Sequence, residues 1–210
     1  IKGFVYDDKD LDANILTLKD VDDGPGLANW IVTLCDEFGV PVPTFLPYVT
    51  QGGINPGVPG YYEFVGVLPG KYIVRETVTP GWFSTIAPTY STTTQDSDVI
   101  TLSGGDTVRR DFGDAQFGSI SGTKWYDWNL GGLWDDSEIG IDGWGITVTG
   151  TTIAGPYGPV THLTGPGPTP PTMDGNGYWE FLGLYPGTYL VTEENRAGWA
   201  HIEPPSGQFS

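Results

Sequence analysis

The chain has 210 residues, of which 32 are glycine and 18 are proline, and its formal net charge is −17. This much glycine and proline works against long helices, whereas the 13% of aromatic residues argues against a disordered chain. An acidic surface of this kind repels nucleic acid, so we expect no nucleic-acid partner. A single cysteine, Cys35, excludes an intrachain disulfide, and no apolar run is long enough for a membrane span. The chain starts at Ile1 rather than at methionine, and we expect it to be a segment of a longer product.

The predicted elements are strands throughout. Residues 29–36 (NWIVTLCD) and 143–150 (GWGITVTG) alternate apolar and polar side chains, which is typical of a half-buried strand. Residues 62–76 (YEFVGVLPGKYIVRE) alternate around a Pro-Gly turn and predict a hairpin. Residues 97–113 predict a further strand pair around a Gly-Gly turn. Only residues 12–21 have any helical character, and this stretch is too short to predict a helix.

The same unit occurs twice in the sequence. Residues 61–82 and 178–199 align over 22 positions, and eleven of these positions are identical. Ile1 matches Ile120 and Trp30 matches Trp144, so the order of the motifs is kept while the loop lengths differ. We therefore predict two tandem domains, at residues 1–116 and 117–210.

The second predicted domain lacks the end of the first. Residues 94–116 complete the first copy, and no counterpart of this stretch follows in the second. A β-sandwich without its last strands exposes unpaired backbone and an apolar groove. We expect either that the second copy is truncated here or that a neighbour completes it with a strand.

The repeated motifs resemble a known family. The runs ISGTKWYDWN at residues 120–129 and GNGYWEFLGLYPGTYLVTEE at residues 175–194, with a following Gly-Trp, resemble the B-type repeats of serine–aspartate-repeat adhesins. These repeats are related to the B-type domains of collagen adhesins and occur in bacterial and archaeal surface proteins. The resemblance implies an all-β fold of two tandem immunoglobulin-like or transthyretin-like β-sandwiches. It also implies an extracellular or cell-surface location, structural calcium, and copies of itself or neighbouring repeats as partners.

Two acidic loops are the candidate calcium sites. Residues 127–138 (DWNLGGLWDDSE) have nearly the ligand spacing of a twelve-residue calcium loop, with glycine at the sixth position. Gly131 stands at the fifth position, where Asp or Asn is usual, so one oxygen ligand is missing there. A longer acidic stretch, residues 8–23, takes the same place in the first copy, but it has alanine at its sixth position and lacks the final glutamate. Spacing alone also fits a solvated acidic turn, and the resemblance favours Ca2+. The expected ligands are Asp127, Asn129, Leu133 (through its carbonyl), Asp135 and Glu138 in one loop, and Asp8, Asp10, Asp12, Asp20 and Asp23 in the other.

Relatives of this fold sometimes crosslink a lysine on the first strand to an Asn or Asp on the last, with the help of a buried glutamate. Glu76 and Glu193 recur at the position of that glutamate. The lysine does not recur, because Lys124 of the second copy aligns with Val5 of the first. We therefore expect no crosslink of this kind.

The predicted function is that of a structural module of a surface protein, filament, sheath or surface layer, stiffened by calcium. Trp125, Trp128 and Trp134 occur only in the second copy, and we expect them to pack between domains or subunits. As an exposed patch they leave an alternative open, an adhesive or carbohydrate-binding module whose partner is a glycan or a surface protein. Tryptophans that recur in both copies, such as Trp30 and Trp144, are expected to pack in the core or at a domain edge. No catalytic constellation occurs, so we do not expect an enzyme.

Overall fold

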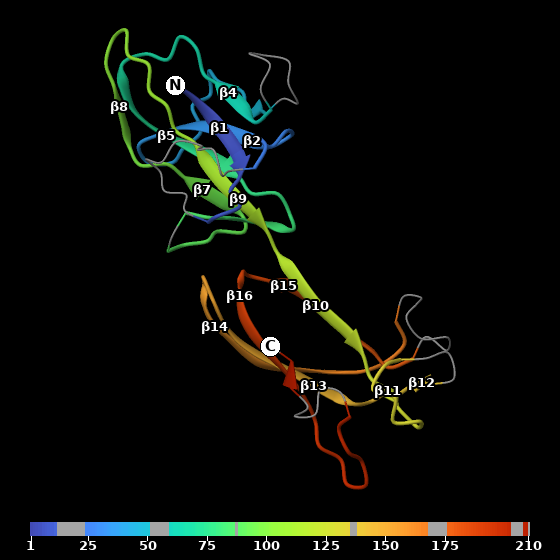
Figure 1. The fold of residues 1–210 in the computed structure, drawn as a ribbon. Helices are drawn as coiled ribbons and strands as arrows, with labels where there is room; N and C mark the ends of the chain where they lie inside the picture. Colours follow the sequence, from blue (N-terminus) through green and yellow to red (C-terminus); the bar gives the residue numbers. More distant parts are fainter. Residues whose placement is uncertain are drawn as a thin grey trace. The chain divides into compact units, whose positions relative to one another are not determined.

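The computed structural model describes residues 1–11, 24–50, 59–86, 88–134, 138–167, 176–202 and 208–209 (Figure 1). These residues form β-strands, turns and extended segments and no helix, which confirms the all-β fold expected from the sequence. Within the described part of the chain, no helix is long and apolar enough to cross a membrane. The chain divides into two compact units, Ile1–Gln116 and Phe117–Ser210, called unit 1 and unit 2 below.

Unit 1 is built from two sheets that enclose one apolar core. The first sheet has the order β4 (Tyr61–Glu63), β1 (Lys2–Asp7), β9 (Phe112–Gln116) and β6 (Trp82–Ser84). The second has the order β3 (Tyr48–Val49), β2 (Ile31–Asp36), β5 (Gly70–Thr77) and β7 (Thr94–Asp96), and β8 (Ile100–Leu102) also pairs with β5. Alternate side chains of both sheets point inward, among them Val5, Tyr62 and Phe112 from the first and Val32, Leu34 and Val74 from the second.

The strand β9 closes the first sheet of unit 1. It runs parallel to β1, with Val5 opposite Phe112 and Asp7 opposite Asp114, and antiparallel to β6 on its other side. The contact begins before β9 itself, because Lys2 N–H donates to the carbonyl oxygen of Val108 at 3.0 Å. The last strand of unit 1 therefore covers the whole length of the first.

Unit 2 has fewer strands than unit 1 among the described residues. The strand β10 (Gly118–Thr123) pairs with β15 (Tyr178–Leu184), and β11 (Trp125–Tyr126) pairs with β12 (Ile139–Gly140). The other sheet has the order β14 (Gly155–Leu163), β13 (Gly145–Thr152), β16 (Gly187–Glu193) and β17 (Gln208–Phe209). Its core consists of Trp144, Ile146, Val148, Trp179, Phe181, Leu184 and Val191. No strand among the described residues of unit 2 corresponds to β8 or β9.

Strand registers agree between the units at the positions matched in the sequence. Gly3 lies opposite Tyr62, and Gly122 lies opposite Trp179. Both glycines are required by close approach, because a Cβ on Gly3 would lie 1.6 Å from the Arg110 carbonyl oxygen and one on Gly122 would lie 2.5 Å from the Trp179 ring. In the second sheet, Val32 lies opposite Glu76 as Ile146 lies opposite Glu193.

The predicted hairpins are wrong. The strand β4 pairs with β1 in one sheet, whereas β5, which follows the Pro-Gly turn, pairs with β2 in the other. The strand pair expected around Gly104-Gly105 is divided in the same way, because β8 pairs with β5 and β9 with β1. Alternation shows that a strand has one buried face, and it does not show which sheet the strand joins.

A threonine fixes the start of the central strand in each unit. The hydroxyl of Thr164 accepts from Trp144 N–H at 2.9 Å and donates to the Ile141 carbonyl at 2.6 Å. Thr50 makes the same two bonds in unit 1, with Trp30 N–H at 2.9 Å and the Leu27 carbonyl at 2.7 Å. Both threonines are buried, so each hydroxyl satisfies two backbone groups that water cannot reach.

We predict that Thr164→Val destabilises unit 2 by about 1–3 kcal/mol, because the isosteric valine leaves a buried N–H and a buried carbonyl without a partner. The free energy of unfolding, followed by tryptophan fluorescence in urea, measures this loss. Thr147→Val is the matched control, since its hydroxyl bonds to Thr161 at the surface, and it should change stability by less than about 0.5 kcal/mol. Equal effects of both substitutions would contradict the proposed role of Thr164.

Candidate functional site

The first acidic loop begins at a buried aspartate. Asp8 follows β1 directly and is 0% exposed. One carboxylate oxygen accepts from Thr85 Oγ1 at 2.5 Å, and the other accepts from Leu11 N–H at 2.9 Å. Its backbone N–H donates to the carbonyl of Asp114 on β9 at 2.8 Å. The closing strand of unit 1 thus covers the first residue of this loop.

The second acidic loop begins at Asp127, directly after β11. Its two carboxylate oxygens accept from Gly131 N–H at 3.0 Å and from Gly132 N–H at 2.8 Å, so the side chain is turned into the loop. Asn129 Oδ1 also accepts from Gly131 N–H, at 2.7 Å. Glu138, the twelfth residue, is only 2% exposed although it is a carboxylate next to a surface strand.

Both loops share one uncommon backbone conformation. Leu11 has a φ of 63° and Leu130 a φ of 58°, and each is the fourth residue of its loop. The left-handed region costs a non-glycine residue roughly 1 kcal/mol, so the surrounding structure holds these leucines there. The two loops therefore turn in the same way after matched first strands, which the sequence did not reveal because leucine is not a turn residue.

The structure describes some of the predicted calcium ligands and not others. Asp8, Asp127, Asn129 and Glu138 lie as described above, while Asp10 and Leu133 are at the exposed surface. Asp12, Asp20, Asp23 and Asp135 lie outside the described residues. Within the described residues alone, no group of three or more acidic, histidine or cysteine side chains is close enough to hold a metal ion. The donors in both loops are oxygens, which is the chemistry that Ca2+ prefers.

A buried pair of carboxyl groups lies in the core of unit 1. Glu76 on β5 and Asp114 on β9 are both 0% exposed. No hydrogen-bond donor elsewhere in the described residues reaches their four oxygens. Burial raises the pKa of Glu76 well above its ordinary value, and the charge of Asp114 raises it further. Burial likewise raises the pKa of Asp114. The two groups can satisfy each other only when at least one is protonated.

This pair makes the stability of unit 1 depend on pH. Both folded-state pKa values lie above the ordinary values of 4.5 and 3.8, so the folded state binds more protons than the unfolded state. The contribution of the pair is complete below pH 4 and is lost as the pH rises through the raised pKa values. We predict that Glu76→Gln, which imitates the protonated acid, stabilises unit 1 at pH 7 and reduces the decline of stability with pH.

Thermal melts of both proteins between about pH 4 and pH 8 measure this effect. Glu63→Gln on β4 removes the same charge at an exposed position and is the control. A control that gains as much stability at pH 7 as Glu76→Gln would show that relief of the net charge of −17, and not the buried pair, is responsible.

In unit 2, a lysine lies beside the glutamate that matches Glu76. Lys124 occupies the position matched to Val5, and its Nζ lies 3.1 Å from the carboxylate of Glu193, which matches Glu76. The Glu193 carboxylate also pairs with His201 Nδ1. Lys124 Nζ lies 4.9 Å from the ring centroid of Trp144 and gains a cation–π contact. Unit 1 thus has two buried acids without a lysine, and unit 2 has a lysine paired with one acid.

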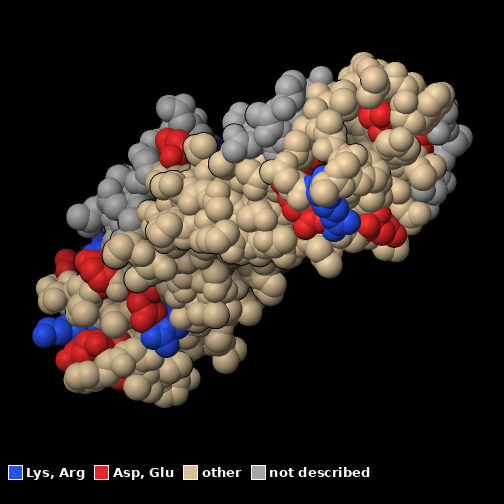
Figure 2. All heavy atoms as spheres, turned by 90° about the horizontal axis from the view of Figure 1, so that it is seen from below, with Lys and Arg blue, Asp and Glu red and all other residues tan. Residues whose placement is uncertain are grey.

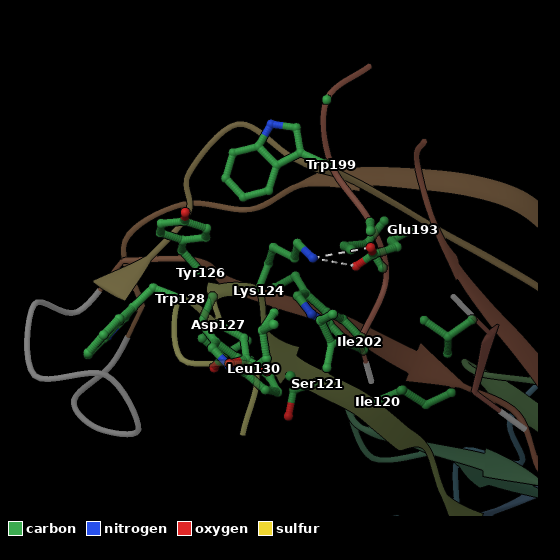
Figure 3. A pocket seen from close by; sticks show the side chains of 18 residues that line it. Ile120, Ser121, Lys124, Tyr126, Asp127, Trp128, Leu130, Glu193, Trp199 and Ile202 are labelled. Atoms are coloured by element: carbon green, nitrogen blue, oxygen red, sulfur yellow. Dashed lines mark hydrogen bonds and ion pairs between the residues drawn. The ribbon is translucent and has the colours of Figure 1, made fainter. Parts of the chain in front are cut away.

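A groove opens beside this ion pair in unit 2. It has a volume of about 520 Å³. It is lined by residues 120–128 and Leu130, by the core residues Ile146, Trp179 and Val191, and by Trp199 and Ile202. The side chain of Lys124 crosses the groove toward Glu193 (Figure 3). Asp127 of the acidic loop also lines it, so the groove ends at the candidate calcium loop.

Aromatic side chains divide into packed and exposed groups. Trp30 contacts Trp82 edge-to-face at 5.7 Å between ring centroids, and Trp144 contacts Trp199 in the same way at 5.1 Å. The prediction that the recurring tryptophans pack in the core or at a domain edge is confirmed for Trp30 and Trp144, which are 4% and 2% exposed, whereas Trp199 remains 45% exposed. Of the three tryptophans found only in the second copy, Trp125 and Trp134 pack against each other, and Trp128 is 58% exposed.

Charged side chains leave much of the visible surface free. On the face drawn in Figure 2, uncharged residues predominate, and the few basic residues lie beside acidic ones. Ion pairs such as Arg75–Asp96 and Arg110–Asp98, each at 2.6 Å, account for basic residues in unit 1. This face offers no basic area of the kind that binds phosphate backbones.

Comparison with known proteins supports the family resemblance. No family model matches the chain. The chain is 28% identical over 192 residues to the serine–aspartate repeat-containing protein F of Staphylococcus epidermidis, and 28% identical over 202 residues to protein D of the same kind from Staphylococcus aureus. The alignments cover 89% and 93% of the chain. The chain spans only 10% and 14% of the length of these relatives.

Solved structures that resemble the chain include the Bacillus anthracis TIE protein and the shaft pilin SpaA from Lactobacillus rhamnosus GG. The first is 20% identical with a TM-score of 0.35, over 93% of this chain and 29% of that one. The second is 13% identical with a TM-score of 0.31, over 94% of this chain and 88% of that one. The expected location, outside the cell or at its surface, agrees with the similarity to the serine–aspartate repeat-containing proteins. The resemblance drawn from the repeated motifs is confirmed, because the chain is homologous over most of its length to segments of serine–aspartate-repeat proteins.

Proposed function

We propose that the chain is an extracellular structural module whose two units act in series within a surface protein, filament, sheath or surface layer, and whose acidic loops are fixed by calcium. The observation that carries the calcium part is the matched geometry of the two loops. Each loop follows the first strand of its unit and holds a left-handed leucine at its fourth position. In each loop, backbone N–H groups turn the first aspartate inward.

A bound cation would be coordinated by the acidic side chains of each loop. Asp8 and Glu138 are buried carboxylates, one in each loop, and carboxylate oxygens are ligands that Ca2+ prefers. Ca2+ takes six to eight oxygen ligands, so the remaining acids of each loop, Asp12, Asp20 and Asp23 in one and Asp135 in the other, would have to join them. A ligand bound only by the folded state stabilises that state, and here it would stiffen the loop beside the first strand. The proposed role is structural, and we expect no catalytic activity.

We predict that removing calcium with a chelator lowers the melting temperature. If calcium was present at a hundred times its dissociation constant, the free energy of unfolding should fall by about 2.7 kcal/mol. Glu138→Gln should lower the melting temperature in calcium and abolish most of the further loss on chelation in unit 2. Differential scanning calorimetry with and without calcium measures both effects.

Glu63→Gln on the exposed edge of β4 is the matched control, because it removes one negative charge far from either loop along the chain. It should leave the response to chelator unchanged. Magnesium at equal concentration separates a specific site from general screening of the net charge of −17. Identical melting temperatures in calcium, magnesium and chelator would remove calcium from the proposal and leave a module without a metal.

A second candidate function is adhesion, and the exposed aromatic rings of unit 2 favour it. Tyr126 and Trp128 lie at the rim of the groove with Trp199, and about half of each side chain is exposed. Rings of this kind can stack on sugars or on a partner protein. A structural subunit would self-associate on size-exclusion chromatography, whereas an adhesin would remain monomeric and bind glycan.

A further inference from the structure

The outer face of the sheet formed by β14, β13 and β16 in unit 2 consists of uncharged residues. Along β13, Ile146 and Val148 are buried in the core, so Thr147, Thr149 and Thr151 point to the opposite face. The outward residues of β14 and β16 that pair with these threonines, or that lie two positions further along, share this face. The nine residues, called the threonine face below, are Thr147, Thr149, Thr151, Pro156, Thr161, Leu163, Thr188, Leu190 and Thr192.

The matched face of unit 1 carries charges. In the alignment of the two copies, Arg75 stands where unit 2 has Thr192, and Lys71 stands where it has Thr188. Arg75 forms an ion pair across the sheet with Asp96 at 2.6 Å. The fold therefore tolerates charged side chains at these positions. The uncharged character of the threonine face is a property of the surface of unit 2, and the packing of the sheet does not require it.

The threonine face can lose its water at little cost. The hydroxyl groups of Thr147 and Thr161 share a hydrogen bond of 2.8 Å, and the Thr192 hydroxyl donates to the Thr147 carbonyl at 3.3 Å. Removing water from polar groups that already have partners costs less than removing it from free ones. Threonine has few χ1 rotamers to lose. The threonine methyl groups add to Leu163 and Leu190, which are 67% and 38% exposed, and give the face an apolar component.

We infer that the threonine face is a contact surface between copies of this chain, on which two molecules pack sheet against sheet about a twofold axis. At a net charge of −17, two copies repel each other, and they do so least where neither contributes a charge to the contact. A twofold contact uses the same patch on both copies, so an uncharged face is complementary to itself. The choice of another copy as the partner rests on the proposed structural role, and the contact does not depend on calcium.

The size of the face predicts a weak contact. The three strands have eight, nine and seven residues. With about 3.3 Å per residue and about 4.8 Å between strands, the face measures roughly 25 by 14 Å. A stable complex buries about 800 Å² on each partner, and this face offers roughly half of that. We therefore expect a reversible contact between free chains, which gains strength where many copies are held side by side.

The test is sedimentation velocity of the whole 210-residue chain at increasing concentration. We expect a reversible monomer–dimer equilibrium. The double variant Thr188→Lys/Thr192→Arg places the residues of unit 1 on the threonine face and should weaken dimerisation at least about tenfold, because the contact would then have to desolvate charges. The variant adds two positive charges to a chain of net charge −17, so general repulsion between copies falls. A loss of dimer therefore cannot come from the net charge.

Thr77→Lys/Thr101→Arg is the matched control. It adds the same two charges at exposed positions on β5 and β8 of unit 1 and should leave dimerisation unchanged or slightly stronger. Thermal melts followed by circular dichroism show whether each variant is folded. Unit 1 already has lysine and arginine at the matched positions, so we expect the unit 2 variant to fold.

A charge exchange tests the twofold contact directly. Thr149 lies opposite Leu190, between the pairs made by Thr147 and Thr151, and so belongs to the middle of the face. Chains with Thr149→Asp and chains with Thr149→Lys should each dimerise at least about tenfold more weakly than the native chain, because like charges meet across the axis. An equal mixture of the two should regain dimerisation, since the charges are then opposite.

The inference is overturned if the native chain stays monomeric at every concentration, if the unit 2 double variant dimerises as well as its control, or if the mixture associates no better than its components. A chain that stays monomeric but binds cellohexaose, and loses this binding in the unit 2 double variant, would assign the face to a glycan. Melting with chelator tests the calcium role separately. A monomeric chain whose melting temperature falls with chelator would refute the twofold contact alone, and a dimer that ignores chelator would refute calcium alone.

Discussion

The parallel pairing of the last strand of a unit with its first strand is the contact on which the rest of the structure depends. In unit 1 this pairing joins β1 and β9, and it is the longest-range contact in the unit along the chain. It seals the core with Phe112 and brings Asp114 against Glu76. It also covers Asp8, the first residue of the acidic loop, through the bond from Asp8 N–H to the Asp114 carbonyl. The apolar core, the buried acid pair and the acidic loop of unit 1 therefore all depend on contacts with β9.

The two units differ in the charged groups that lie beside the first strand. Unit 1 buries two carboxyl groups together and has valine where a cation could stand, so burial raises the pKa of both groups. Unit 2 places Lys124 at the valine position and pairs it with Glu193 at 3.1 Å. A buried ion pair is costly to form from separated, hydrated groups, and breaking it by removing one partner costs more still. The lysine therefore gives the Glu193 carboxylate a cationic partner, whereas no donor among the described residues outside the acid pair reaches the Glu76 carboxylate.

The sequence was sufficient to predict the strands and the repeat, because alternation and self-similarity are local properties. It could not assign strands to sheets. The hairpin expected at residues 62–76 is a crossing between sheets, since either arrangement gives the same alternation. The first acids of the two loops could be chosen from their spacing, but Asp114 could not be singled out. An acidic residue in a short strand is normally exposed, and its burial depends on a partner 38 residues away, Glu76. The prediction that residues 94–116 have no counterpart in unit 2 is wrong for β7, because β17 pairs with β16 as β7 pairs with β5, whereas β8 and β9 have no counterpart among the described residues of unit 2.

The closing strand also links the groove to the acidic loop. In unit 1, Asp8 is completely buried, and Thr85 and β9 lie over it. In unit 2, Asp127 lines the open groove and its carboxylate is turned into the loop by Gly131 and Gly132. Excluding water from an acidic group strengthens its charge interactions. The covered Asp8 and the partly exposed Asp127 therefore lie in different electrostatic surroundings, although each is the first acid of its loop.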